Sequence, residues 1–451
     1  MIIIFSVVVI LVFFLYRLNQ NTCSYWSARG VPYVPATPLF DKNILKSLLP
    51  TPENLGKIYK SAEGKDYVGF FLLRTPVLMV CNPEIINGVL RQDFQKFSAN
   101  RKPECVREDD PLSQHLLALQ GEKWKNLRSK IIPVFTSGKL KSMYYLINER
   151  VEEFLRVLDQ YEGKPIDAEK FCSQISISSI VSCAFGLDTK CMDPANDRFL
   201  KIGRSAFEAG FWKMVKVQLK MFHPAIFNFL RLTGYSKDSS DFCENFIKDV
   251  IAHRRASGYT RSDYVDILMK IQKELSERPG QDNGLSDSLI AAQVFSFLVA
   301  GYETTTTTLC CALYELAKHP QIVEQVRAEV LESLGTSGCF NYETLMGMEL
   351  LERVIKETLR KHPPVVFLPR ICTETTYLPG TEVMIEKGTQ LLIPVLNLHH
   401  DPIYVPQPDE FMPERFSNQK QFALPNVPYM PFSDGPRKCI GEHKINGQTF
   451  K

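Results

Sequence analysis

The spacing of apolar positions predicts a mainly helical chain with a small amount of sheet. Two β-rich runs, Tyr67–Leu73 and Pro76–Val80, flank Arg74-Thr75 and predict a hairpin. Two later runs, Tyr377–Ile385 and Thr389–Val395, are also expected to be strands. Most of the remaining chain has helical spacing, so we expect an α+β fold in which helices dominate.

The strongest helical signal begins near Ser286-Asp287, either of which can cap the helix, and continues past Leu316. This stretch is long and apolar, as expected for a buried central helix. It contains five consecutive threonines, residues 304–308, whose hydroxyls can bond to backbone carbonyls and bend the helix. A packing kink at Gly301 is an alternative interpretation of the same segment.

The N-terminal region predicts attachment to a membrane. Residues 2–16 form an uncharged apolar run closed by Arg17, so we expect residues 1–17 to be a retained transmembrane signal anchor. A cleaved signal peptide competes with this interpretation. The first positive charges follow the run, which predicts a cytosolic position for the rest of the chain. Residues 18–40 are rich in proline and are expected to act as a hinge.

Composition excludes several classes of protein. The 451 residues are 45% hydrophobic and 23% charged, which suits a chain with a large buried core. A net charge of +3 gives no argument for nucleic-acid binding. The 12 cysteines form no Cys-x-x-Cys pair, so we expect reduced thiols in a cytosolic environment.

One cysteine lies in a distinctive loop, Phe432-x-x-Gly435-x-Arg437-x-Cys439-x-Gly441. A single cysteine is most often a small buried apolar residue. Here the glycines favour tight turns around the sulfur, and the arginine supplies donors suited to a carboxylate. The segment resembles the haem-thiolate loop of the cytochrome P-450 monooxygenases, in which the cysteine is the axial ligand of haem iron.

The resemblance implies further haem contacts. Trp124 and Arg128 share one face of a predicted helix. By themselves they indicate an ordinary amphipathic helix, whereas the resemblance implies that they bind a haem propionate. Pro369-Arg370 resembles a second propionate-binding position. The implied cofactor is haem b, held by Cys439 with help from Phe432 and Arg437.

The segment Ala300-Gly301-Tyr302-Glu303-Thr304 resembles the oxygen-activation motif of the same family. The resemblance implies that Gly301 leaves room for dioxygen, that Thr304 hydrogen-bonds it, and that Glu303 takes part in proton delivery. An acid and an alcohol together suit O–O cleavage. Thr304 therefore favours monooxygenation over peroxide rearrangement.

A third motif is structural. Leu351, Val354, Ile355 and Thr358 are spaced as one buried helix face. Glu357 and Arg360 lie off that face and, without further context, indicate a surface salt bridge. With Arg415 they resemble the family's buried charge network, whose loss would cost about 3–5 kcal/mol.

Two other groups of residues can each be interpreted in two ways. His399-His400 could bind a metal, but the resemblance implies a structural turn. Six aromatic residues either line a substrate route or belong to the core or a membrane-contacting surface. They are Phe207, Phe211, Trp212, Phe222, Phe227 and Phe229.

Local charge suggests a protein partner. Lys123, Lys125, Lys130, Lys139 and Lys141 make one region basic, which is either a solvated face or a docking patch. The resemblance implies an NADPH–cytochrome reductase as electron donor, and cytochrome b5 as an additional candidate. It also implies a lipophilic substrate and an endoplasmic reticulum membrane location.

The resemblance covers residues 41–441, which we expect to form the haem-thiolate monooxygenase domain, and is closest to insect microsomal members that oxidise xenobiotics. Residues 442–451 do not match, so we expect the helix after the cysteine loop and the terminal sheet to be missing. The predicted function is insertion of one oxygen atom of O₂ into a lipophilic molecule. The alternatives are an inert protein of the same ancestry that lacks haem or sequesters reductase, and a thiol enzyme that uses Cys439 without iron.

Overall fold

The computed structural model describes most of the chain. The described residues are 24–36, 51–72, 75–100, 106, 110–187, 196–207, 215–216, 219–220, 224–233, 237–261, 263–277, 285–335, 340–417 and 427–442. The expected anchor, residues 1–17, and the tail from residue 443 lie outside them.

The chain forms two compact units. We call residues 1–102, 365–410 and 418–438 the sheet unit. Residues 103–364, 411–417 and 439–451 are the helical unit. Each unit therefore combines segments that are far apart in the sequence.

A four-stranded mixed sheet organises the sheet unit. Its strands, in the order β1-β2-β6-β3, are Tyr67–Leu72, Thr75–Val80, Gln390–Ile393 and Leu368–Ile371. β1 and β2 pair antiparallel, which confirms the predicted hairpin. β6 pairs parallel with β2 and antiparallel with β3. The sheet is therefore completed by strands from a distant part of the chain.

One strand prediction is wrong. The run Tyr377–Ile385 contains two short strands, β4 (Thr376–Tyr377) and β5 (Met384–Ile385), that pair antiparallel with each other. The chain reverses between them, where Leu378 and Val383 share a backbone hydrogen bond of 2.8 Å. Gly380 has a φ of +72° in this turn, so the polar turn breaks what the apolar pattern suggested was one strand.

Short helices complete the described part of the sheet unit. They are η1 (Ser27–Arg29), α2 (Pro52–Ser61), α3 (Pro83–Asn87), η3 (Gly88–Gln92), η4 (Phe94–Phe97), α16 (Val395–His399) and η11 (Gly435–Arg437). Proline follows the cap residue in both α2 and α3, where its missing N–H costs nothing. Thr51 and Asn82 cap these two helices with their side chains.

His399 ends α16, so the expected turn at this position is in part helical. The His399 side chain is buried, and its Nε2 atom accepts the backbone N–H of Met430 at 3.0 Å. Among the residues that the structure describes, no cluster of His, Cys, Asp or Glu suits a metal ion.

The described part of the proline-rich hinge is fixed to the sheet. Trp26 is fully buried, and its Nε1 donates to the carbonyl of Phe70 at 3.2 Å. Val34 donates to the Gly69 carbonyl, and Gly69 donates to Pro32, both at 2.8 Å. A Cβ on Gly69 would lie 2.5 Å from the Trp26 ring. Residues 24–36 are therefore anchored by backbone pairing and one large buried side chain.

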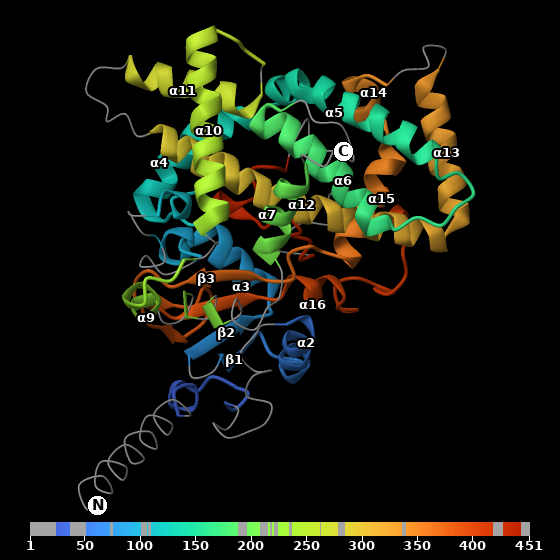
Figure 1. Ribbon diagram of the computed structural model, residues 1–451. Coiled ribbons are helices and arrows are strands. Elements are labelled where there is room, and N and C mark those ends of the chain that lie inside the picture. The colour runs from blue at the N-terminus through green and yellow to red at the C-terminus, as the bar shows by residue number, and fades with distance from the viewer. Residues whose placement is uncertain are drawn as a thin grey trace, which may run out of the picture. The chain divides into compact units, whose positions relative to one another are not determined.

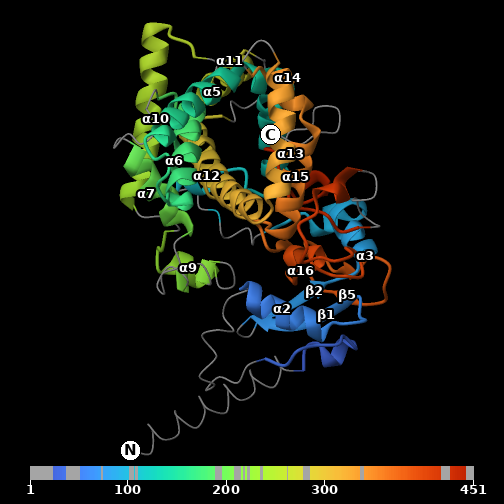
Figure 2. The same ribbon diagram turned by 90° about the vertical axis from the view of Figure 1, so that its right-hand side faces the viewer.

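The helical unit contains most of the helices. They are η6 (Pro111–Ser113), α4 (Gly121–Ile131), η7 (Ile132–Phe135), α5 (Ser137–Asp159), α6 (Ala168–Ile180), η8 (Val181–Phe185), α7 (Asn196–Phe207), α9 (Pro224–Phe229), α10 (Lys237–Ser257), α11 (Tyr264–Ser276), α12 (Asp287–Lys318), α13 (Pro320–Leu334), α14 (Tyr342–Gly347), α15 (Glu349–Lys361) and η9 (Pro413–Ser417). Figure 2 shows α13 and α15 side by side, in agreement with their contacts.

The long helix α12 lies at the centre of the helical unit, with α6, α10 and α15 packed against it (Figure 1). It begins as predicted, because the Ser286 side chain accepts the N–H of Leu289 at 3.2 Å. It continues without interruption to Lys318, although it contains the run of threonines. Burial of the apolar residues of α12 therefore outweighs the low helical propensity of its threonines.

The predicted aromatic cluster is divided. Phe227 is 2% exposed, whereas Phe229 at the end of α9 is 86% exposed. The other four side chains lie outside the described set. In the ranges that the structure describes, no helix has the length and apolarity needed to cross a bilayer.

Candidate functional site: the cysteine loop and the central helix

The loop before Cys439 is held by a close backbone approach. Gly435 has a φ of +72°, and a Cβ at this position would lie 1.9 Å from the carbonyl oxygen of Leu90. Only glycine fits both conditions. The Asp434 side chain accepts the Gly435 N–H at 2.7 Å and caps η11. The guanidinium of Arg91 binds the same carboxylate through Nε at 3.0 Å and NH2 at 2.7 Å.

Part of this support was not predicted from the sequence. Asp434 precedes a Gly-Pro pair, and this arrangement is a recognisable signal for a capping residue. Arg91 offers no local signal, because its partner is 343 residues away in the sequence. Only the folded sheet unit brings them together.

Arg370 is a buried cation beside this loop. It lies on β3, is 3% exposed, and donates to the Pro369 carbonyl at 2.8 Å and to the Ser433 hydroxyl at 3.1 Å. Its Nε is buried and makes no hydrogen bond with a described residue. Burial lowers the pKa of Arg370 to about 10. A buried guanidinium without a carboxylate partner is costly, so this position is suited to an anionic ligand.

The other two expected cofactor residues of the sheet unit lie in the cysteine loop. The Nε of Arg437 donates to the Ser98 carbonyl at 2.5 Å. Phe432 is half-buried. Ser433, between them, has a φ of +63°, a conformation that is uncommon for residues with a side chain.

In the helical unit, α4 presents the Trp124–Arg128 pair as predicted on one face. Trp124 is buried, and the Arg128 guanidinium carbon lies 5.5 Å from its ring centre. Burial lowers the pKa of Arg128, and the charge on Cys439 opposes that change. Cys439 itself is exposed, so its sulfur is accessible to a ligand.

The central helix carries the three expected oxygen-activation residues. A Cβ on Gly301 would lie 3.1 Å from the Ile180 side chain, so this glycine also allows α6 to approach closely. The Thr304 hydroxyl donates to the Ala300 carbonyl at 2.7 Å, and Thr308 does the same to Thr304. This confirms that the threonines bond to the preceding turn.

Glu303 lies among charged groups of α6 and α7. Burial raises the pKa of Glu303, the Glu169 carboxylate raises it further, and Arg204 opposes both. Arg204 also donates to the Tyr302 hydroxyl at 3.4 Å. A carboxyl whose pKa is raised keeps its proton to a higher pH than an ordinary glutamate does.

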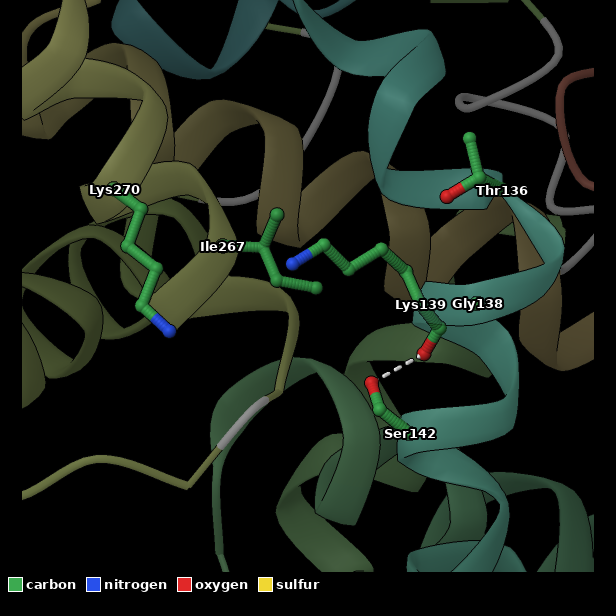
Figure 3. Close-up of a pocket in the computed structure, with 6 residues that line it drawn as sticks. All are labelled: Thr136, Gly138, Lys139, Ser142, Ile267 and Lys270. Carbon is green, nitrogen blue, oxygen red and sulfur yellow. Dashed lines mark hydrogen bonds between the residues drawn. The ribbon is translucent and has the colours of Figure 1, made fainter.

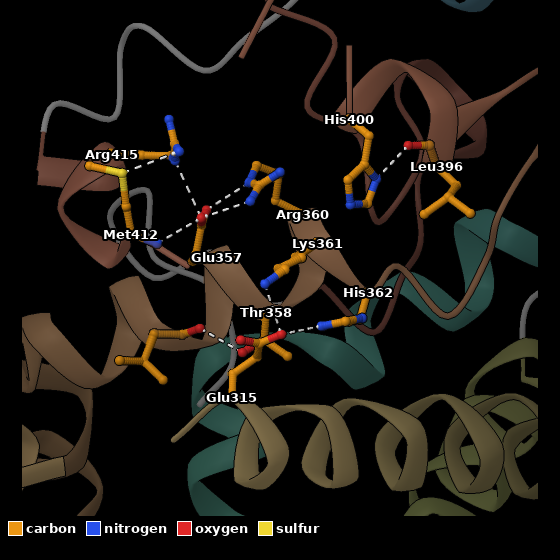
Figure 4. A network of polar contacts seen from close by, with 11 residues as sticks. Glu315, Glu357, Thr358, Arg360, Lys361, His362, Leu396, His400, Met412 and Arg415 are labelled. Atoms are coloured by element: carbon orange, nitrogen blue, oxygen red, sulfur yellow. Dashed lines mark hydrogen bonds and ion pairs between the residues drawn. The ribbon is translucent and has the colours of Figure 1, made fainter. Parts of the chain in front are cut away.

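Glu357, Arg360 and Arg415 form a buried network (Figure 4). Two nitrogens of Arg360 each lie 2.8 Å from Glu357, which is 0% exposed. The Nε of Arg415 and the N–H of Met412 reach the same carboxylate at 3.3 and 3.0 Å. The interpretation of Glu357 and Arg360 as a surface salt bridge is therefore wrong. The spacing of these residues could not predict their burial, because the burial depends on the packing of residues 411–417 against α15.

The basic region is mostly solvent-facing. Lys123, Lys125 and Lys139 are exposed, and Lys141 forms an ion pair with Glu343 on α14. A hollow of 280 Å³ lies between α5 and α11, where Lys139 extends toward Ile267 (Figure 3). The residues that line it are Thr136, Gly138, Lys139, Ser142, Ile267 and Lys270. None of the expected haem or oxygen residues is among them.

Comparison with known proteins decides the family. The family model for cytochrome P-450 matches residues 44–443. The chain belongs to the cytochrome P-450 family. Cytochrome P-450 6k1 of Blattella germanica is 33% identical over an alignment of 441 residues that covers 93% of this chain and 83% of that protein. Probable cytochrome P-450 6a20 of Drosophila melanogaster is 34% identical over 427 residues, covering 93% of this chain and 85% of the relative.

Cytochrome P-450 6a2 of Drosophila melanogaster is 34% identical over 448 residues, covering 95% of this chain and 86% of the relative. These matches confirm the predicted resemblance to insect members and the mainly helical cytochrome P-450 fold. The chain is thus a haem-thiolate monooxygenase, an oxidoreductase whose cofactor is haem b. The buried Arg370 with its unpartnered Nε fits that cofactor, since haem carries two propionates.

Proposed function

We propose that this cytochrome P-450 oxidises lipophilic small molecules, namely xenobiotics, toxins or endogenous lipids and hormones. One oxygen atom of O₂ enters a C–H bond of the substrate, and the other leaves as water with two electrons and two protons. The electrons come from NADPH through a flavoprotein reductase. The similarity to insect relatives supports the choice of substrate class.

The observation that carries the haem assignment is the buried guanidinium of Arg370 beside the cysteine loop, whose Nε has no hydrogen-bond partner among the described residues. In this proposal Cys439 is the thiolate ligand. Arg370, Arg437 and Arg128 bind propionates, since guanidinium groups match carboxylates in geometry and charge. Trp124 and Phe432 are assigned to the same cofactor as further binding residues.

When bound, haem supplies iron for activation of O₂. The chain supplies the protons. Glu303, whose pKa is raised by burial and by Glu169, takes part in proton delivery in this proposal. The Thr304 hydroxyl donates to the Ala300 carbonyl, one turn earlier on the same helix. In this proposal the Thr304 hydroxyl would release the Ala300 carbonyl and donate a hydrogen bond to dioxygen instead. Gly301 would leave room for the dioxygen molecule next to α12.

Glu357, Arg360 and Arg415 have a structural role in this proposal. Their ion pairs fix residues 411–417 to α15. The exposed lysines of α4 and α5 would attract an acidic partner by long-range electrostatics. We assign them to the docking of the reductase, with cytochrome b5 as a second partner on the same surface.

We further propose that the protein resides in the endoplasmic reticulum membrane. The supporting feature is the apolar run of residues 2–16, followed by Arg17, which places the following domain in the cytosol. The segment 24–36 would then join that anchor to the sheet through the buried Trp26. Residues 18–40 act as the hinge and residues 41–441 as the catalytic domain.

The absorption spectrum of the ferrous carbon-monoxide complex tests the assignment. The 451-residue chain, expressed in membranes, should show the red-shifted Soret band of a thiolate ligand. Cys439→Ser should abolish this band, whereas the matched change Cys310→Ser should leave it. A band that survives Cys439→Ser would refute the ligand assignment. A chain that is present but binds no haem would favour the inert alternative.

A further inference from the structure

Glu315 is a buried carboxylate that the proposed function does not use. It lies near the C-terminal end of α12, and its side chain is 1% exposed. One oxygen, Oε1, accepts His362 Nε2 at 2.7 Å and Lys361 Nζ at 3.1 Å (Figure 4). The other oxygen, Oε2, is buried and makes no hydrogen bond with a described residue, although His319 Nδ1 lies 3.8 Å away.

The carboxylate is charged at neutral pH. Burial by itself raises the pKa of Glu315, but hydrogen bonds from His362 and Lys361 outweigh burial and hold the pKa below its ordinary value. Glu315 is therefore a buried anion held by two groups at the C-terminal end of α15. His319, which follows the last residue of α12, and Cys311, on the same helix, are further ionisable side chains close to it.

The ion pairs of Glu315 with Lys361 and His362 join the C-terminal end of α12 to the C-terminal end of α15. α12 ends at Lys318, and α15 ends at Lys361 with His362 as its cap residue. Glu315 follows Thr304 by 11 residues, about 16 Å along an uninterrupted helix. Lys361 follows Glu357 by one turn, so two ion clusters occupy consecutive turns of α15 (Figure 4).

The ion pairs of Glu315 are better explained by a role in fixing the position of α12 than by a contribution to stability. Apolar side chains of similar volume could pack two helices together without the desolvation of a charge. Buried ion pairs restrict geometry more than apolar contacts do, because few arrangements satisfy them. A carboxylate that uses one oxygen for two partners defines how far α12 can slide or rotate against α15.

We propose that Glu315 is a positioning residue for oxygen activation, which it serves by fixing α12 to Lys361 and His362 and thereby setting the place of Thr304 and Glu303. The proposal rests on the oxygen-activation role of Thr304 given above. A small displacement of a reacting group can cost up to about a hundredfold in rate. Misplacement of Thr304 should therefore divert electrons from product to hydrogen peroxide.

The test compares variants of the haem-loaded protein with reductase and NADPH. Glu315→Gln and Lys361→Met should raise the share of NADPH electrons recovered as hydrogen peroxide by roughly two- to tenfold. Lys361→Arg should restore the wild-type share, since it keeps the cation. The matched control is Glu349→Gln on α15, which removes an exposed pair with Arg353 at 3.4 Å. It should change nothing.

A second readout separates position from folding. The Soret band of the ferrous carbon-monoxide complex, normalised to protein, reports how much chain retains thiolate-bound haem. Peroxide release is expressed per haem-loaded molecule. If Glu315→Gln and Lys361→Met lower only the haem-loaded fraction, with peroxide share unchanged, the positioning role is overturned. The positioning role is also overturned if Lys361→Arg releases the same share of hydrogen peroxide as Lys361→Met.

Thr304→Ala distinguishes the inference from the function on which it rests. An increase in peroxide release in Thr304→Ala, with no change in the Glu315 and Lys361 variants, would overturn the positioning role alone. No increase in Thr304→Ala would overturn the proposed role of Thr304 itself. Increases in Thr304→Ala, Glu315→Gln and Lys361→Met support both.

Discussion

Replacement of Arg370 by methionine should weaken haem binding and leave the stability of the haem-free protein nearly unchanged. Burial lowers the pKa of Arg370 from its ordinary value to about 10. At about 1.4 kcal/mol per pH unit, the fold disfavours the buried charge by about 3 kcal/mol. Because the charged form is the disfavoured one, this cost is fully present at neutral pH and would decline only as the pH rises above about 10.

The substitution also removes hydrogen bonds to Pro369 and Ser433. Two bonds from a charged donor contribute about 3 kcal/mol together, so the two effects nearly cancel. We expect the haem-free protein to keep its stability within about 1–2 kcal/mol. Haem binding, in contrast, loses a charge-assisted propionate contact and should weaken about 10- to 100-fold.

Two measurements check these expectations. Denaturant unfolding of the haem-free protein gives the change in stability, and transfer of haem to an acceptor protein gives the rate of haem loss. Arg91→Met is the matched control, because Arg91 binds Asp434 of the same loop from a half-exposed position. It should cost at most about 1 kcal/mol and leave haem loss unchanged. The reasoning would be refuted if Arg370→Met lowered the free energy of unfolding of the haem-free protein by about 3 kcal/mol. It would also be refuted if the variant lost haem at the wild-type rate.

Three further predictions follow from the same geometry. Gly435→Ala places a Cβ against the Leu90 carbonyl at an unfavourable φ, so it should destabilise the protein by about 3 kcal/mol or more in thermal unfolding; a normal melting temperature would contradict this. Glu357→Gln removes the buried charge that binds the guanidinium groups of Arg360 and Arg415 and should cost about 3–5 kcal/mol in denaturant titration, whereas the Glu349→Gln control should cost at most about 1 kcal/mol. Because burial and Glu169 raise the pKa of Glu303, the fold disfavours its ionised form. Wild type should lose stability relative to Glu303→Gln as pH rises through that pKa and should gain it back in acid, which melting curves between about pH 4 and 8 would show; a difference independent of pH would argue against it.

The sequence by itself determined the local elements and the family. Two β-rich runs and the short break between them predicted the β1–β2 hairpin, and Ser286-Asp287 ahead of a long apolar stretch predicted the start of α12. The residues around Cys439 resemble the haem-thiolate loop of the cytochrome P-450 family, and this resemblance implied that Cys439 is the haem ligand. These signals are readable because they depend on neighbouring residues and on backbone preferences.

Tertiary structure alone decided which charges are buried and which distant segments meet. Glu357 and Glu315 look like ordinary helix-surface carboxylates in the sequence, yet they are 0% exposed in the structure. Arg370 becomes a buried cation because β3 pairs with β6, and β6 in turn pairs with β2, whose residue 77 lies opposite residue 390. Burial and long-range pairing depend on how complete elements pack, so no local pattern contains them.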